Sequence, residues 1–241
     1  MALRDLLRDV SPPFLWRAAS AFRHGRPTSP NYQGVTTLAN LSALHGGRFA
    51  EVYDAAYRRD PGLLPDGNTV RLRVYQSYLF ATIASKVKGD FVSVGISYGV
   101  TAKVIYELVL RGRERTYHLV DPFTDDSGAG YCKDAPAVMR QFGGDPFVRL
   151  HRAAAPQVFP LDFVGGLAFA ELNTGDDGAD LESLPYLVER LHPEGVIVLD
   201  DYAWGPWMSR LDEEARALGA SIFCLPTGQG VLLKEPSTVG V

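Results

Sequence analysis

Short apolar runs alternate with longer helical patterns along most of the chain, and this alternation constrains the fold more than any other feature. Apolar runs predict strands at 91–94, 116–120, 147–151, 166–171 and 196–199, and helices are expected at 100–110, 135–142, 179–191 and 206–218. Strands that alternate with helices build a parallel sheet covered on both faces, and strands buried on both sides have continuous apolar runs like these. The pattern therefore predicts an α/β protein with a mostly parallel sheet.

The last part of the chain breaks this alternation. Apolar runs at 221–225 and 231–234 are separated only by the turn residues 226–230, which leaves no room for a helix. Two strands joined by so short a connection must be antiparallel. We therefore expect the sheet to end in a C-terminal antiparallel hairpin.

The segment before the first strand is predicted to be helical, without strands. Helices are expected at 36–59 and 69–88, so we divide the chain into an N-terminal helical arm or lid, 1–88, and a core, 89–241. The arm either covers a site, a partner subunit or a membrane surface, or it is a plain helical extension of its own domain. A homo-oligomer formed through these helices is one expectation.

Charge, cysteine content and apolar run length exclude several classes of protein. The 241 residues have a formal net charge of −4 and contain two cysteines, so we expect neither nucleic-acid binding nor a disulfide scaffold or multi-cysteine zinc site. No apolar run approaches the ~20 residues that span a bilayer. The apolar stretch 14–22 contains Arg17 and does not resemble a secretory signal, which predicts a cytoplasmic protein.

A glycine-containing loop follows the first predicted strand. Gly95, Ser97 and Gly99 lie where a ligand can approach bare backbone, although they do not complete the three-glycine dinucleotide fingerprint. Asp121 ends the second predicted strand, where an acidic side chain can bind the hydroxyls of a ribose. A generic strand–helix turn and a turn-forming aspartate are the alternatives. Tyr98 beside the glycines either lines the site or packs in the core.

Acidic and amide side chains follow the fourth and fifth predicted strands. Glu171 and Asn173 end one, and Asp200 and Asp201 end the other, so they come together if these strands are neighbours. Neighbouring carboxylates repel unless a cation neutralises them, and oxygen ligands suit Mg²⁺. We predict a magnesium site of Glu171, Asp200 and Asp201. The alternative is that the aspartates only cap a helix or begin a turn.

Together the glycine turn, the acidic residue after the second strand and the final hairpin resemble the class I S-adenosylmethionine-dependent methyltransferases. The resemblance covers about residues 70–234 and implies a Rossmann-like, seven-stranded sheet and S-adenosylmethionine as cofactor. Within that class, the segments 169–173, 191–202 and 225–230 resemble the macrocin O-methyltransferase (TylF-type) family. Those enzymes methylate sugar hydroxyls of natural products with the help of a divalent metal.

The family resemblance also assigns roles to particular residues. Asp200 and Asp201 match its metal ligands, whereas Glu171 stands where the family usually has Asp and Asn173 where many members have a second Asp. The segment from Asp121 to Phe123 resembles the family's Asp-x-Phe, so the predicted cofactor-binding residues are those of this segment and of the glycine loop: Gly95, Ser97, Tyr98, Gly99, Asp121 and Phe123.

Methyl transfer to a hydroxyl needs a dry pocket, an in-line arrangement and a base. The catalytic candidates are Glu171, as base or metal ligand, Asp201 through the metal, and His151 at the end of the third predicted strand. His151 can equally be a surface or capping histidine. Tyr202, with Trp204 and Trp207, forms either an aromatic wall for the substrate or part of the core.

The sequence thus favours an S-adenosylmethionine-dependent O-methyltransferase acting on a small hydroxylated acceptor, such as a sugar of a natural product or glycan. A catechol-like phenol is the nearest variant, because a diol can chelate a metal in both. Two other classes stay open: an NAD(P)-dependent oxidoreductase on a similar sheet, and a non-catalytic methyltransferase-like module. The incomplete glycine fingerprint and the final hairpin argue against the oxidoreductase.

Overall fold

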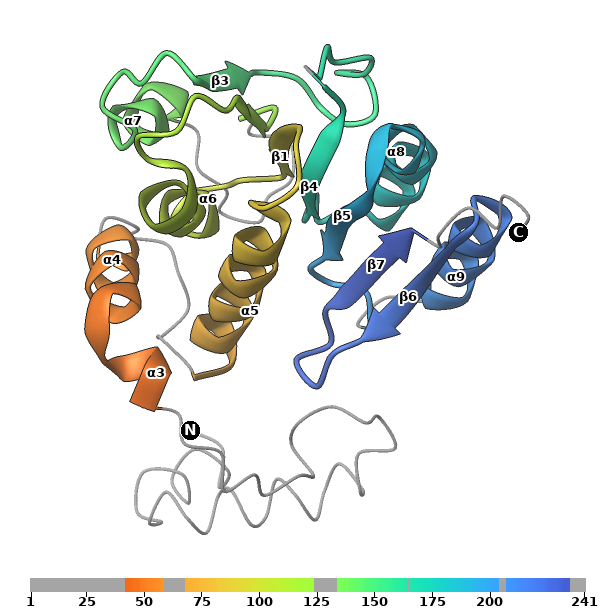
Figure 1. The fold of residues 1–241 in the computed structure, drawn as a ribbon, viewed down its shortest axis with the longest axis horizontal. Helices are drawn as coiled ribbons and strands as arrows, with labels where there is room; N and C mark the ends of the chain where they lie inside the picture. Colours follow the sequence, from red (N-terminus) through yellow and green to blue (C-terminus); the bar gives the residue numbers. More distant parts are fainter. Residues whose placement is uncertain (1–41, 59–67, 124–133, 164, 204–206, 235–241) are drawn as a thin grey trace, which may run out of the picture. The chain divides into compact units, whose positions relative to one another are not determined.

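A computed structural model describes most of the chain beyond the N-terminal forty residues (Figure 1). The described ranges are 42–58, 68–123, 134–163, 165–203 and 207–234. The predicted arm up to residue 41, the first residues of the helix expected at 36–59, and Trp204 lie outside them.

Seven strands form a single mixed sheet in the order β3-β2-β1-β4-β5-β7-β6. They are β1 (Asp90–Val94), β2 (Tyr117–Val120), β3 (Val148–His151), β4 (Leu167–Leu172), β5 (Leu191–Leu199), β6 (Ala220–Cys224) and β7 (Gly230–Lys234). The first five strands run parallel, and β7 is antiparallel to both β5 and β6. The predicted Rossmann-like sheet with a C-terminal hairpin is confirmed. The chain order reverses between β1 and β4, which is where ligands bind in open α/β sheets.

Strand β5 is longer than the 196–199 predicted for it. It begins at Leu191, opposite Leu167, and its register then jumps so that Val196 lies opposite Phe169. The residues between, which follow the helix expected at 179–191, form an irregular start to the strand. The proline and glycine in this stretch signal a break in local pattern, but only pairing with β4 shows that the break lies inside a strand.

Helices precede, connect and cover the strands. They are α3 (Ser42–His45), α4 (Gly47–Tyr57), α5 (Asn68–Ala84), α6 (Val100–Ile105), α7 (Ala135–Arg140), α8 (Asp177–Arg190) and α9 (Met208–Ala217), with a π-helical turn η2 (Tyr106–Leu110) that continues α6. The Asp176 side chain accepts hydrogen bonds from the N–H groups of Gly178 and Ala179, which caps α8.

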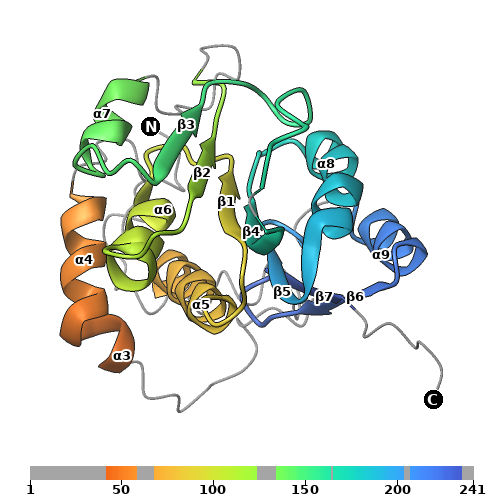
Figure 2. The same cartoon turned by 45° about the horizontal axis from the view of Figure 1, so that its top comes forward.

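Two apolar cores lie on opposite faces of the sheet, because successive side chains of a strand point to opposite sides. Phe91 faces α5, α6 and α7, whereas Val92 faces α8 and α9. Figure 2 shows these two helix layers on either side of the strands. A third cluster joins α4 to α5 and α6 through Phe49, Tyr53 and Val74. Helix α5 also contacts β4 and β5, which brings it beside the carboxyl edge of those strands.

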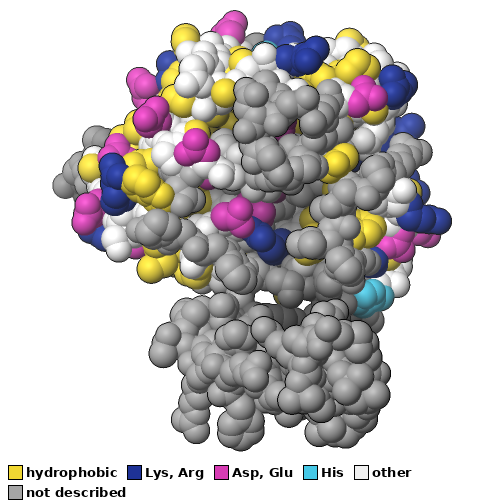
Figure 3. All heavy atoms as spheres, turned by 180° about the vertical axis from the view of Figure 1, so that it is seen from behind, with side chains coloured by type: hydrophobic (Ala, Val, Ile, Leu, Met, Phe, Trp, Pro, Cys, Tyr) yellow, Lys and Arg dark blue, Asp and Glu magenta, His cyan; other side chains and the backbone are white. Residues whose placement is uncertain are grey.

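Two further observations concern the helices and the surface of the described residues. None of their helices is long and apolar enough to cross a membrane. Acidic and basic side chains lie interspersed over the described part of the face seen in Figure 3.

Candidate functional site

The candidate site begins where β1 ends, at the glycine loop. Gly95 has a φ of +78°, and a Cβ there would lie 1.9 Å from the carbonyl oxygen of Asn173. The end of β1 therefore lies against the end of β4, and only glycine fits between them. Gly99, with a φ of +80°, begins α6, and Ser97 between the two glycines also has a positive φ of 47°. The whole predicted loop is thus a tight turn at the switch point of the sheet.

Asp121 links this loop to the end of β2. Its carboxylate accepts one hydrogen bond from the N–H of Ser97, at 2.9 Å, and another from the N–H of Phe123, at 2.8 Å. Burial raises the pKa of Asp121, and the backbone N–H groups oppose that shift. Ser97, Asp121 and Phe123 come from two separate segments that were each predicted to bind the cofactor. Hydrogen bonds to the Asp121 carboxylate therefore join these segments into one unit.

One pocket, here called the glycine-loop pocket, opens beside this unit. Its volume is about 840 Å³ when the open solvent at its mouth is included. Its lining residues come from the ends of β1 and β2, from the segments that follow β1, β2, β3 and β4, and from the first turn of α8: Val94, Gly95, Ser97, Val120, Asp121, Pro122, Ala153, Ala154, Ala155, Asn173, Thr174, Asp176 and Ala179.

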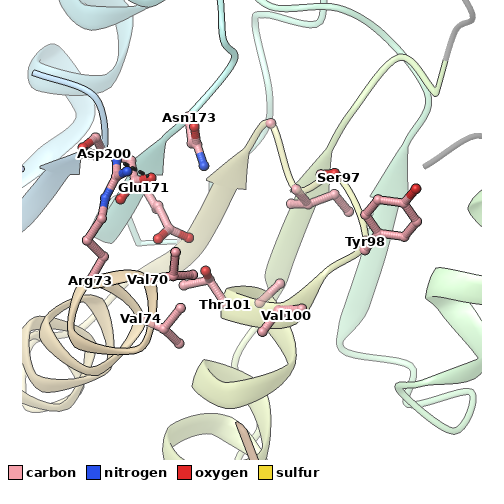
Figure 4. Close-up of a pocket in the computed structure, with 13 residues that line it drawn as sticks. Val70, Arg73, Val74, Ser97, Tyr98, Val100, Thr101, Glu171, Asn173 and Asp200 are labelled. Carbon is pink, nitrogen blue, oxygen red and sulfur yellow. Dashed lines mark hydrogen bonds and ion pairs between the residues drawn. The ribbon is translucent and has the colours of Figure 1, made fainter. Parts of the chain in front are cut away.

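A second pocket, here called the acidic pocket, is shown in Figure 4. It encloses about 690 Å³ including its mouth. Its lining combines apolar side chains of α5 and α6 with charged groups at the strand ends: Val70, Arg73, Val74, Gly95, Ile96, Ser97, Tyr98, Val100, Thr101, Ala102, Glu171, Asn173 and Asp200. Gly95, Ser97 and Asn173 line both pockets, so the two meet at the glycine loop.

Glu171 is a buried carboxyl group at the edge of the acidic pocket. Only 5% of the residue is exposed, and its Oε2 accepts a hydrogen bond from Ser93 Oγ at 3.2 Å. Burial, with a further contribution from the charge of Asp200, raises the pKa of Glu171 to about 7; Ser77, Ser93 and Arg73 oppose the shift.

Arg73 of α5 holds the two aspartates that follow β5. Its Nη2 lies 2.7 Å from Asp200 Oδ2 and 2.5 Å from Asp201 Oδ1. The amide Nε2 of Gln229 donates to the other oxygen of Asp200 at 2.7 Å. Burial raises the pKa of Asp200, while Arg73 opposes the shift. Both carboxylates are therefore already ion-paired with Arg73, and Asp200 is also hydrogen-bonded by Gln229.

This arrangement does not fit the predicted magnesium site. A divalent ion needs several oxygen ligands turned toward one point. Among the residues that the structure describes, no three His, Cys, Asp or Glu side chains form such a group. The guanidinium of Arg73 lies against the oxygens of Asp200 and Asp201 that would serve as ligands.

The structure separates other predicted residues from the pockets. Asp201 and His151 line neither pocket. His151 instead lies beside His118 of β2: the rings stack, and Nε2 of His151 is 3.0 Å from Nδ1 of His118. Burial lowers the pKa of His151, and the neighbouring His118 and Arg149 add to the shift.

The aromatic candidates divide between the site and the core. Tyr98 lines the acidic pocket, whereas Phe123 is buried and lines neither pocket. Gly99, also predicted to bind the cofactor, lines neither pocket. Tyr202 belongs to the core beneath α8 and α9, and its hydroxyl donates to Asp212 at 2.7 Å, which favours the core interpretation for this residue.

Sequence reasoning missed three polar residues of the acidic pocket's surroundings: Arg73, Ser77 and Gln229. Arg73 and Ser77 lie within a segment predicted as a helix, but its apolar spacing says nothing about which polar side chains turn inward. Gln229 lies in the turn segment that carries part of the family resemblance. Its signal was a polar residue flanked by two glycines at the hairpin turn, where its side chain points inward to Asp200.

Comparison with solved structures identifies the fold. The O-methyltransferase NovP matches with a TM-score of 0.55 and 18% sequence identity, over 68% of this chain and 80% of NovP. The calicheamicin methyltransferase CalS11 has a TM-score of 0.52 and 13% identity over 81% and 96% of the two chains. SAH-bound PaMTH1, a methyltransferase of Podospora anserina, has a TM-score of 0.51 and 14% identity over 81% and 93%. No family model and no curated protein matches the chain. The chain thus has the fold of the class I S-adenosylmethionine-dependent methyltransferases.

Proposed function

We propose that this protein is an S-adenosylmethionine-dependent O-methyltransferase that methylates a hydroxyl of a small acceptor. One observation carries the proposal: two small-molecule pockets meet at Gly95, Ser97 and Asn173. A buried aspartate lies in one of them and a buried glutamate in the other. A two-substrate transfer needs this division, since donor and acceptor must be held side by side.

The glycine-loop pocket is our candidate for the cofactor. Asp121 is placed to accept hydrogen bonds from nucleoside hydroxyls, because a carboxylate oxygen that takes one backbone N–H still has a lone pair to offer. Gly95 and Ser97 of the loop line this pocket beside Asp121. The cofactor supplies a methyl group on a positively charged sulfur.

The acidic pocket is our candidate for the acceptor. Val70, Val74 and Val100 give it an apolar wall that excludes water from the reacting atoms. Glu171 is the group placed to take the proton of an acceptor hydroxyl, since it lines this pocket and lies on the strand next to the glycine loop. The carboxylates and the amide of Asn173 offer hydrogen-bond partners for a second hydroxyl.

A sugar of a natural product or glycan is the proposed acceptor class. Several polar groups beside one apolar wall suit a polyhydroxylated ring better than a simple alcohol. Structures of similar fold include the O-methyltransferase NovP, which supports transfer to oxygen, and the calicheamicin methyltransferase CalS11, which supports a natural-product acceptor. A catechol-like phenol is the variant to be compared in the same assay.

The test is calorimetric titration of the protein with S-adenosylhomocysteine. We expect binding that Asp121→Asn weakens at least about tenfold, equivalent to roughly 1.4 kcal/mol. Asp145→Asn is the matched control, because Asp145 also accepts the N–H two residues ahead, at 2.9 Å from Phe147, but lies in neither pocket. We expect Asp145→Asn to bind like the unaltered protein.

Two results would contradict the proposal. Binding of NADH without binding of S-adenosylhomocysteine would identify an oxidoreductase instead. Binding of S-adenosylhomocysteine without methylation of any sugar or catechol acceptor, in assays with radiolabelled methyl donor, would favour the non-catalytic module.

A further inference from the structure

Arg73 brings a permanent positive charge into the acidic pocket from outside the sheet. It lies on α5, 127 residues before Asp200 in the chain, and its side chain is only 20% exposed. The Asp200 side chain is 15% exposed. Charges this far from water persist only when they are paired, so each group requires the other.

A closed network of hydrogen bonds and an ion pair between α5, the hairpin turn and Asp200 holds Arg73 in position. Arg73, Gln76 and Ser77 lie three and four residues apart and share one face of α5. Gln76 contacts Thr227 of the hairpin turn, with 2.6 Å between Oε1 and Oγ1, and Ser77 Oγ lies 3.2 Å from Gln229 Nε2. Gln229 also donates to Asp200. Asp200 in turn pairs with Arg73, as Figure 4 shows.

The guanidinium contacts the same two carboxylates that a divalent cation was predicted to bind. Two adjacent carboxylates, Asp200 and Asp201, would repel each other without a cation between them. Arg73 contacts an oxygen of each with the same nitrogen, Nη2, and a guanidinium stays protonated at every physiological pH. Arg73 thereby reduces the repulsion between the aspartates and offsets one of their two negative charges without a metal.

We propose that Arg73 is the resident cation of the acidic pocket and takes the place of a divalent metal at Asp200 and Asp201. In this arrangement the two aspartates position Arg73 instead of binding a metal, and Arg73 in turn fixes their orientation at the pocket edge. The proposal depends on the proposed function only in taking this pocket as the acceptor site.

The experiment measures Mn²⁺ binding by electron paramagnetic resonance of free Mn²⁺ and by calorimetry. The unaltered protein is expected to bind no Mn²⁺ that depends on Asp200. Arg73→Met, which removes the charge, is expected to bind Mn²⁺ at least about tenfold more tightly, and Arg73→Met with Asp200→Asn to lose that gain. Arg73→Lys retains a cation and is expected to behave like the unaltered protein.

Arg111→Met is the matched control. Arg111 also pairs with a carboxylate, Glu107, at 2.7 Å, but its partner is additionally held by Lys103 at 2.6 Å, outside the acidic pocket. We expect no gain in Mn²⁺ binding from it.

Three results would overturn the proposal. The first is Mn²⁺ binding by the unaltered protein that Asp200→Asn removes. The second is a gain in Arg73→Lys as large as in Arg73→Met, and the third is a folded Arg73→Met variant with no gain. If Arg73→Met does not fold, the unaltered protein and Arg73→Lys decide the question. S-adenosylhomocysteine binding by the unaltered protein is measured separately, so failure of the proposed function is recognised independently.

Discussion

At the scale of single residues, Gly95 shows how one position joins two segments of the site. Its positive φ favours glycine, and the adjacent Asn173 carbonyl leaves no space for a side chain. The two effects can be separated, because Gly112 has the same φ of +78° with nothing within 4 Å of the position of a Cβ.

We predict that Gly95→Ala destabilises the protein far more than Gly112→Ala. The Gly112 variant carries only the cost of a left-handed conformation, about 1–2 kcal/mol. Gly95→Ala adds the displacement of the β4 end and should exceed it by at least about 2 kcal/mol. Urea unfolding followed by circular dichroism measures both. Equal losses would mean that the backbone at Asn173 yields without cost.

At the scale of elements, the β6–β7 hairpin does more than close the sheet. Its turn carries Thr227 and Gln229, both almost fully buried, to the polar face of α5. Gln229 contacts Ser77 and Asp200, so one amide joins the hairpin, a helix and the end of β5. A buried amide of this kind is costly to remove, because its partners lose their donors.

We therefore predict that Gln229→Leu, a change of similar volume, lowers the free energy of unfolding by about 1–3 kcal/mol. The reason is that Asp200 and Ser77 are then left with fewer hydrogen-bond partners in a buried place. Thr82→Val is the comparison: its hydroxyl donates to the carbonyl of Tyr78 at the exposed side of the same helix, so its effect should stay within about 0.5 kcal/mol. Chemical denaturation distinguishes them, and a Gln229→Leu protein as stable as the original would show that the tether is energetically unimportant.

At the scale of the whole molecule, several buried titratable groups couple folding to pH in opposite directions. His151 has a lowered pKa, so the folded protein favours its neutral form, and the unfolded chain binds more protons. Its contribution to stability is present above the ordinary value of 6.5 and is lost as pH falls from there through the lowered pKa. Asp121, Glu171 and Asp200 have raised pKa values and act in the opposite sense, losing stability as pH rises.

Because these effects overlap, the contribution of His151 is predicted as a difference. The stability of the unaltered protein relative to His151→Gln should fall as pH decreases below about 6.5, owing to protonation of a partly buried ring beside His118 and Arg149. Thermal unfolding across pH 5 to 8 measures this, with His192→Gln at the irregular start of β5 treated identically. A pH-independent difference would contradict the assignment.

Local sequence pattern was enough to predict the seven strands, the helices after them and the final hairpin. Runs such as 91–94 and 196–199 predict strands because the spacing of apolar residues within a strand or helix indicates which of its faces is buried. The same reasoning predicted that the glycine loop and Asp121 belong to one site, since parallel strands end at a common edge. It missed the early start of β5, which depends on a partner strand.

Tertiary packing alone decided what neutralises the acidic residues. The sequence predicts a cation near Asp200 and Asp201, because adjacent carboxylates repel, but that repulsion is the same whether a metal or a guanidinium reduces it. The choice depends on how α5 packs against β4 and β5, which brings Arg73 across 127 residues of chain to Asp200. Contacts between distant segments leave no periodic trace in either segment, and for that physical reason only the folded structure shows them.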